Sequence, residues 1–294
     1  MPKPPAPLPT LFFCVGATKA GTSWLHSQLR DHPDCHLRSI KELHYFSMTT
    51  QTQFARAIRS ARTEEAGLRD KIKTVAPDKL AYLQRRVTDL ADWGQVLQAG
   101  LGAHDRYLDY LGAGGGTKRL IGDVTPAYGL LPADTLTAMA RLTADVRFVY
   151  LMRDPVDRLW SHVRMNAARA DRNGFAAASL QMLNDILSGK LTPEMDGILR
   201  RGDYVTILDK LQSAVPDGRF LPVFYEDLFK GDGLGRITDF LDVARIAPKA
   251  EARVHAGLPL ALPAELESRT RGFLSGQYDG VERWLGALPE AWRR

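Results

Sequence analysis

The chain has 294 residues, of which 45% are hydrophobic and 25% charged, as in an ordinary globular protein with a substantial core. That length fits one large α/β domain, so we expect a single domain over residues 1–294. The net charge of +5 is mild, and no dense basic stripe with interleaved aromatic residues occurs, so nucleic acid is not an expected partner. Nothing in the sequence indicates an oligomeric state.

The cysteines, the histidines and the lengths of the apolar segments argue against disulfides, a metal site and a membrane-spanning helix. The two cysteines, Cys14 and Cys35, lack a CxxC partner and are expected to be reduced. The seven histidines show no HxH or HExxH spacing, so no metal site is predicted. No stretch approaches the ~20 apolar residues of a membrane helix. We therefore expect no stable membrane insertion and a cytoplasmic protein.

Compact apolar runs and helical periodicity alternate along the chain. The runs predict four short, buried, parallel strands: Leu11–Val15, Leu120–Asp123, Val146–Met152 and Phe220–Phe224. Helices are predicted at Thr22–Arg30, Pro155–Ala168, Tyr204–Ser213, Leu234–Asp242 and Val281–Leu288. This alternation predicts an α/β fold, with a central parallel sheet covered by helices on both faces.

Two regions depart from this alternation. Residues 50–111 are rich in Ala, Arg, Gln, Leu and Asp, with helical spacing and no strand signal. We expect an all-helical insertion over one edge of the site, because an unstructured loop of that length is uncommon. Residues 248–294 are expected to form a polar loop followed by a helix. Acceptor specificity is assigned to the insertion and to residues 171–200.

The segment GATKAGTS at Gly16–Ser23 stands directly between the first predicted strand and the first predicted helix. In this arrangement glycines allow close backbone approach, and the free amide groups and dipole of the helix attract an anion. Lys19 can add a point charge, and Thr22 and Ser23 can donate hydrogen bonds or cap the helix. The alternative is an ordinary strand–helix turn, which the lysine inside the turn disfavours.

The magnesium–nucleotide loop GxxxxGK[ST] has its lysine directly after the second glycine. Here Thr22 takes that place, and Lys19 lies two residues before Gly21. Asp123 is the available candidate for holding magnesium. An ATP-dependent small-molecule kinase therefore stays as a disfavoured alternative.

A second anion site is predicted where the third strand ends. Arg153 lies at the carboxyl end of that strand, where open α/β sheets contact ligands, and Ser161 follows about two helical turns later. Together they can bracket one phosphate group. In the alternative, Arg153 pairs with Asp154 or Asp157, and Ser161 is an ordinary helix residue.

Two segments resemble those of the sulfotransferases that use 3′-phosphoadenosine 5′-phosphosulfate (PAPS). GATKAGTSWL resembles their 5′-phosphosulfate loop, and VYLMRDPVDRLWSHV resembles their 3′-phosphate motif. The resemblance implies a P-loop-like PAPS site with 3′-phosphoadenosine 5′-phosphate (PAP) as product and no metal. It implies that Arg153 and Ser161 contact the 3′-phosphate. Contacts to the 5′-phosphosulfate are implied for Thr18, Lys19, Ala20, Gly21, Thr22, Ser23 and Trp24.

Three shorter segments are similar to the branch that includes the heparan sulfate sulfotransferases and their bacterial relatives. They are KELHYF at Lys41–Phe46, DVTPAY at Asp123–Tyr128, and Arg201-Gly202-x-Tyr204. The RKG-type segment of the cytosolic phenol and steroid branch is absent. A small-molecule or carbohydrate acceptor is implied, with a hydroxyl or amine as nucleophile. The family's basic C-terminal loop cannot be placed uniquely, and its candidates are Arg253, His255, Arg269 and Arg271.

Sulfuryl transfer needs stabilisation of the leaving oxygen and a base for the proton of the nucleophile. Lys19 is the candidate for the bridging oxygen. Glu42 is the leading base candidate, with His44 as rival or orienting partner, since both would project to one face of an extended segment. Lys41 can bind an anionic acceptor. Asp123 and Tyr128 can contact the acceptor or order the Lys19 loop, with a purely structural role as the alternative.

One further alternative keeps the nucleotide fold without catalysis. Such a protein would bind sulfated or phosphorylated ligands and transfer nothing. The presence of Lys19, Glu42, Arg153 and Ser161 disfavours it.

Overall fold

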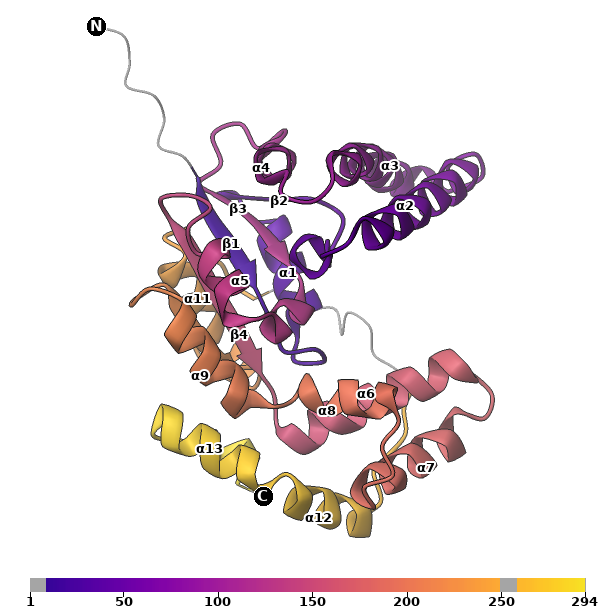
Figure 1. Cartoon of the computed structure of the whole chain (residues 1–294), viewed down its shortest axis with the longest axis vertical. Helices are drawn as coiled ribbons and strands as arrows, with labels where there is room; N and C mark the ends of the chain where they lie inside the picture. The colour runs from indigo at the N-terminus through magenta and orange to yellow at the C-terminus, as the bar shows by residue number, and fades with distance from the viewer. Residues whose placement is uncertain (1–8, 249–257, 294) are drawn as a thin grey trace, which may run out of the picture.

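The computed structural model describes residues 9–248 and 258–293 (Figure 1). Its sheet has five parallel strands in the order β2-β3-β1-β4-β5. The strands are β1 (Thr10–Cys14), β2 (Cys35–Leu37), β3 (Leu120–Val124), β4 (Val146–Met152) and β5 (Phe220–Phe224). The α/β prediction and the four predicted strands are confirmed. Strand β2 was missed because its three residues, with the polar His36 in the middle, form no apolar run.

Strand β1 lies at the centre of the sheet. Leu11 pairs with Ile121 of β3 on one side and with Val146 of β4 on the other. From β1 the chain goes to the edge strand β2, returns to β3 beside β1, then crosses to β4 and β5 on the other side. The carboxyl end of β1 is therefore a topological switch point, where open α/β sheets bind ligands.

Helices cover both faces of the sheet. In Figure 1, α5 and α9 lie in front of the sheet and α1 lies behind it. The helices outside the insertion are α1 (Thr22–Arg30), α5 (Ala133–Met139), α6 (Pro155–Ala170), α7 (Phe175–Leu187), α8 (Pro193–Arg200), α9 (Tyr204–Ala214), α10 (Asp227–Lys230), α11 (Gly233–Phe240), α12 (Ala264–Phe273) and α13 (Ser275–Leu285). Three short 3₁₀ turns are η1 (Tyr45–Ser47), η2 (Pro126–Leu130) and η3 (Glu290–Trp292).

The predicted helical insertion is confirmed as α2 (Gln51–Ile72), α3 (Pro77–Ala99) and α4 (His104–Gly112). Helices α2 and α3 form a hairpin that extends away from the sheet (Figure 1). Thr50 and Gln53 cap the start of α2 reciprocally. The buried residues of α2 form one stripe at intervals of seven: Phe54, Ala61 and Leu68. This stripe packs α2 against α3 within the hairpin.

The carboxyl edge of the sheet borders a layer built from α6, α7, α8 and α12 (Figure 1). Leu159 and Val163 of α6 pack with Leu183 and Ile198 in a separate small core. The predicted C-terminal helix is present as α13, which starts six residues earlier than predicted, and α12 precedes it. Within residues 9–248 and 258–293, no helix is long and apolar enough to span a bilayer.

Candidate functional site

The loop that follows β1 is fixed by backbone hydrogen bonds to β4. The amide of Ala17 donates to the carbonyl of Leu151 at 2.6 Å, and the amide of Leu151 donates to the carbonyl of Gly16 at 2.8 Å. A Cβ atom on Gly16 would overlap the ring of Tyr150. Gly16 therefore lets the loop lie directly on β4, which positions the residues that follow.

The same loop leaves the start of α1 open for an anion. The N-cap residue of α1 is Gly21, whose φ of 89° lies in the left-handed region and which has no side chain to cap the helix. The first turn contains no acidic residue. Lys19 also has a left-handed φ, of 72°. Free amide groups and the positive end of the helix dipole thus point out of the loop, an arrangement that is favourable for an anion.

Lys19 sits in a positively charged environment. Its Nζ lies 3.8 Å from the Sδ of Met165 on α6, a weak acceptor. Burial lowers the pKa of Lys19, and neighbouring positive charges lower it further. Those charges belong to Arg153, Arg164, Arg169 and Lys41. The electrostatic potential at Lys19 is therefore positive, which favours binding of a multiply charged anion.

Arg153 follows β4 directly, and its backbone is held by Tyr204. The Tyr204 hydroxyl donates to the Arg153 carbonyl at 2.6 Å and accepts from its amide at 3.2 Å. The guanidinium lies 5.0 Å from the ring centre of Tyr225 and pairs with Asp157 at 3.3 Å. Its Nε is buried without a partner. The alternative in which Arg153 pairs with Asp157 is thus observed, but it leaves the Nε donor of Arg153 without a partner. Ser161 is half-buried on α6, the helix that also carries Asp157.

Of the four C-terminal basic candidates, the structure describes Arg269 and Arg271, and these two have different partners. Arg271 pairs with Asp154 at 3.4 Å, and Asp154 also caps α6 by accepting from backbone amides. Arg269 is exposed, 3.4 Å from the Oδ1 of Asn184. Arg253 and His255 lie outside the described residues. Arg164 was not predicted; its charge helps to lower the pKa of Lys19, its Nη1 donates to the carbonyl of Leu258 at 3.0 Å, and its Nε is buried without a partner.

An aromatic surface borders the loop. The rings of Trp24 and Phe229 are 4.8 Å apart, and those of Tyr225 and Phe229 are 5.0 Å apart. A Cβ on Gly21 would lie 2.6 Å from the ring of Tyr225, so only glycine permits this contact. Phe229 is 46% exposed, and the Nε1 of Trp24 is buried without a partner. Aromatic faces of this kind can stack a nucleobase.

Sequence reasoning predicted Trp24 but missed Tyr225 and Phe229. Both follow β5, whose carboxyl end lies at the same edge of the sheet as that of β4. Aromatic residues directly after the last predicted strand were the available signal, because ligands bind at that edge.

The segment with Glu42 and His44 is not extended as predicted. Both residues have left-handed φ angles, 64° and 56°. The chain must turn sharply here to enter η1, while the amide of Glu42 donates to the carbonyl of Val124 at 3.1 Å. The two side chains nevertheless meet, with 3.7 Å between Glu42 Oε2 and His44 Nε2. They are 47% and 45% exposed, so both are accessible from solvent.

Glu42 is an ionised carboxylate at neutral pH. Burial raises the pKa of Glu42, but the nearby imidazole of His44 and the charge and hydrogen bond of Lys41 outweigh burial and lower it to about 2. Lys41 Nζ lies 2.5 Å from Glu42 Oε1. Arg201, for which no role was predicted, is also close enough for the charge of Glu42 to raise its pKa, although burial lowers it overall.

Asp123 and Tyr128 lie inside the core. Asp123 Oδ2 accepts hydrogen bonds from the hydroxyls of Tyr107 at 2.9 Å and Tyr128 at 2.8 Å, and Oδ1 accepts from Thr125 at 2.7 Å. Burial raises the pKa of Asp123, and these bonds oppose that rise. The amide after Tyr128 donates to the carbonyl of Val15 at 2.8 Å. This geometry favours an ordering of the Lys19 loop, or a purely structural role, over direct contact of Asp123 and Tyr128 with the acceptor.

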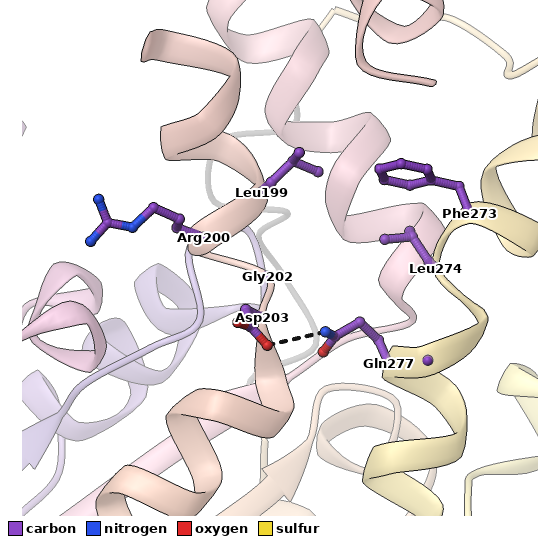
Figure 2. A pocket seen from close by; sticks show the side chains of 8 residues that line it. Leu199, Arg200, Gly202, Asp203, Phe273, Leu274 and Gln277 are labelled. Atoms are coloured by element: carbon purple, nitrogen blue, oxygen red, sulfur yellow. Dashed lines mark hydrogen bonds between the residues drawn. The ribbon is translucent and has the colours of Figure 1, made fainter. Parts of the chain in front are cut away.

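A separate hollow of about 280 Å³ lies where α8 and α9 meet α12 and α13 (Figure 2). Gln277 Nε2 donates to Asp203 Oδ1 at 3.1 Å across it. It is lined by Leu199, Arg200, Gly202, Asp203, Phe273, Leu274, Gly276 and Gln277. No predicted site residue lines it. Within residues 9–248 and 258–293, no group of three His, Cys, Asp or Glu side chains could hold a metal ion.

Comparison with known proteins agrees with this geometry. Residues 9–246 match the model of the sulfotransferase family. No curated protein sequence matches the chain at a significant level.

Three solved structures share the fold. A sulfotransferase from Alicyclobacillus acidocaldarius is 19% identical with a TM-score of 0.64, and the match covers 98% of this chain and 100% of that one. The sulfotransferase domain of the Synechococcus PCC 7002 olefin synthase is 23% identical with a TM-score of 0.53, covering 96% of each chain. The sulfotransferase domain from the curacin biosynthetic pathway is 19% identical with a TM-score of 0.53, covering 92% of this chain and 98% of that one.

Proposed function

The chain belongs to the sulfotransferase family and is a sulfotransferase enzyme, and from that premise we propose that it transfers the sulfuryl group of PAPS to an acceptor hydroxyl or amine, releasing PAP. The observation that carries the proposal is the meeting of three features at one edge of the sheet. They are the open amide groups at Gly21, the cations around Lys19 and the aromatic surface at Phe229. A donor with a 5′-phosphosulfate, a 3′-phosphate and an adenine needs all three.

Unpartnered polar atoms support the fit of this donor. Arg153 and Arg164 each keep a buried Nε without a partner, and the Nε1 of Trp24 is in the same state. Buried donors are normally satisfied, so these three atoms have hydrogen-bonding capacity left for a ligand at this site. In the proposed complex the loop around Lys19 binds the 5′-phosphosulfate. Arg153 and Ser161 bind the 3′-phosphate, with Arg164 as an addition.

The proposed mechanism is an in-line displacement at sulfur. A bond forms between the acceptor oxygen or nitrogen and sulfur while the bond from sulfur to the bridging 5′-phosphate oxygen breaks, and PAP leaves with that electron pair. Lys19 stabilises the charge that develops on the bridging oxygen. The carboxylate of Glu42 takes the proton of the acceptor, and His44 orients it, as their 3.7 Å separation allows.

We propose a carbohydrate-like acceptor, as in the heparan sulfate branch. The segment that carries Lys41, Glu42 and His44 supports this choice, because its carboxylate and imidazole are both exposed beside a cation. The proposed base is accessible to a bulky acceptor, which a site for small, flat phenols would not require.

The kinase alternative is less well supported. Asp123, the carboxylate considered for magnesium, is buried and accepts hydrogen bonds from Tyr107, Tyr128 and Thr125. A carboxylate with its oxygens occupied in this way would have to lose those bonds to bind a cation. The non-catalytic alternative is disfavoured by the exposed Glu42.

Calorimetric titration with PAP tests the proposal, with ATP and magnesium as the control ligand. We expect tight PAP binding that is indifferent to magnesium and is weakened by Arg153→Ala. Incubation with PAPS and saccharide acceptors then tests transfer. Magnesium-dependent binding of ATP in place of PAP would instead support the kinase. PAP binding without transfer to any acceptor, in a protein with Glu42 intact, would support the non-catalytic binder.

A further inference from the structure

Two side chains of α3 hold both backbone polar groups of Ser39. Asp89 Oδ2 accepts from the Ser39 amide at 2.6 Å, and Arg86 Nη1 donates to the Ser39 carbonyl at 3.1 Å. Asp89 and Ser39 are both buried. Ser39 stands three residues before Glu42. A loop peptide next to the proposed base is therefore fixed by the helical insertion, not by the sheet.

The residue before Ser39 is held by the same helix. Arg38 Nη2 lies 3.0 Å from Asp89 Oδ1 and 2.5 Å from Asp92 Oδ2. Its guanidinium lies 4.3 Å from the ring centre of Tyr110 on α4. Arg38 is buried, and a buried charge is held firmly when its partners are hydrogen-bonded in good geometry. Asp89 thus joins α3 to two consecutive loop residues.

Arg86 extends the connection to the outer helix of the hairpin. Its Nε and Nη2 donate to Glu64 Oε1 on α2, at 2.9 and 2.5 Å. Glu64, Arg86 and Ser39 therefore form one continuous series of charged and polar contacts, from the outer helix to the loop. A two-donor arginine–carboxylate contact fixes direction as well as distance.

The backbone of Glu42 needs such support. A left-handed φ in a residue other than glycine is unfavourable and persists only where the surroundings impose it. The sheet supplies one contact, from the Glu42 amide to Val124. We propose that Asp89 and Arg86 are positioning residues that hold Glu42 in its catalytic orientation, an inference that rests on the proposed function. The α2–α3 hairpin then orients the base as well as covering the site.

Two variants and one control test this role. Asp89→Asn removes the charge that Arg38 needs, and Arg86→Gln removes the contacts to Ser39 and Glu64 at a less buried position, in case the first variant folds poorly. Arg85→Gln is the matched control, because Arg85 is the neighbouring arginine on the exposed face of α3. The first readout is hydrogen–deuterium exchange of the peptide that covers residues 38–47, compared with residues 10–25. The second is PAPS hydrolysis, in which water replaces the acceptor and PAP is released.

We expect exchange in residues 38–47 to rise about tenfold in both variants and to stay unchanged in residues 10–25. PAP release should fall about tenfold in kcat with the KM for PAPS unchanged, because a base contributes roughly 10²–10⁴-fold and these variants misplace it without removing it. Unchanged exchange, or faster exchange with unchanged kcat, overturns the proposal. Failure of the unaltered protein to bind PAP contradicts the proposed function instead, and the exchange result still decides whether α3 holds the loop.

Discussion

The ammonium of Lys19 lies 3.8 Å from the thioether sulfur of Met165. Thioether sulfur is a weak acceptor, and the charges that act on Lys19 are those of other cations. Burial and this repulsion lower the pKa of Lys19, so its protonated form destabilises the protein until an anion binds. The positive charge of Lys19 therefore lowers the stability of the ligand-free protein, and the proposed function requires that charge.

Lys19→Met should therefore stabilise the ligand-free protein and abolish most transfer. Removal of one preorganised charge at a leaving oxygen lowers kcat by roughly 10²–10³-fold. The gain in stability should shrink as pH rises through the lowered folded pKa of Lys19, because the parent then loses the costly proton. Thermal unfolding across pH, with Lys79→Met as a control on an exposed lysine, checks this. A variant less stable than the parent at neutral pH would contradict it.

Arg153→Met should lower affinity for PAP but not for AMP, which lacks the 3′-phosphate. A hydrogen bond to a charged group contributes about 1.5–3 kcal/mol, or roughly 10–100-fold in the dissociation constant. Calorimetry with both nucleotides gives the ratio directly. Arg172→Met, at an exposed arginine after α6, serves as the control. An equal loss for PAP and AMP would place the 3′-phosphate elsewhere.

Phe229→Ala should weaken binding of PAP without changing binding of inorganic pyrophosphate. The ring is 46% exposed beside Trp24, and stacking of a base on an aromatic face contributes about 1–3 kcal/mol. Phe273→Ala is the matched control, since Phe273 is 47% exposed on α12, on the lining of the separate hollow. If pyrophosphate binding fell together with PAP binding, Phe229 would support the phosphate-binding loop and would not stack on the adenine.

The positions of the proposed anion loop and of Arg153 could be predicted from the sequence, because each directly follows one strand. A strand, a glycine-bearing turn and a helix are contiguous, so the backbone geometry that opens the amide groups after Gly16 is local. Arg153 follows from the same rule, since side chains at the carboxyl ends of parallel strands meet at one edge.

The other site residues depend on contacts between distant segments. Phe229 of α10 reaches Trp24 of α1 only through the packing of two segments that lie about 200 residues apart, which no spacing reveals. The burial of Asp123 depends on Tyr107, which comes from the insertion. The left-handed turn at Glu42 is imposed from outside the segment, by Val124 and the side chains of α3 on Ser39. Local propensity could not predict it, because non-glycine residues rarely adopt that region unaided.

Glu42 should stabilise the fold above its unfolded pKa and lose that contribution in acid. Its folded pKa is lowered from 4.5 to about 2, so the folded state binds fewer protons than the unfolded state between these values, and stability falls as pH drops through this window. A shift of that size would correspond to about 3 kcal/mol, but the side chain is 47% exposed, and solvent screening reduces the contribution to about 1 kcal/mol.

Glu42→Gln therefore separates the stabilising and catalytic roles of this carboxylate. Denaturant unfolding should show the variant about 1 kcal/mol less stable than the parent above pH 5, with the difference vanishing near pH 2, because protonation then gives the parent the same neutral side chain. At neutral pH the variant should bind PAP normally but transfer roughly 10²–10⁴-fold more slowly. Glu267→Gln, at an exposed glutamate of α12, should change neither property. Full activity in Glu42→Gln would exclude Glu42 as the base and make His44 the residue to test.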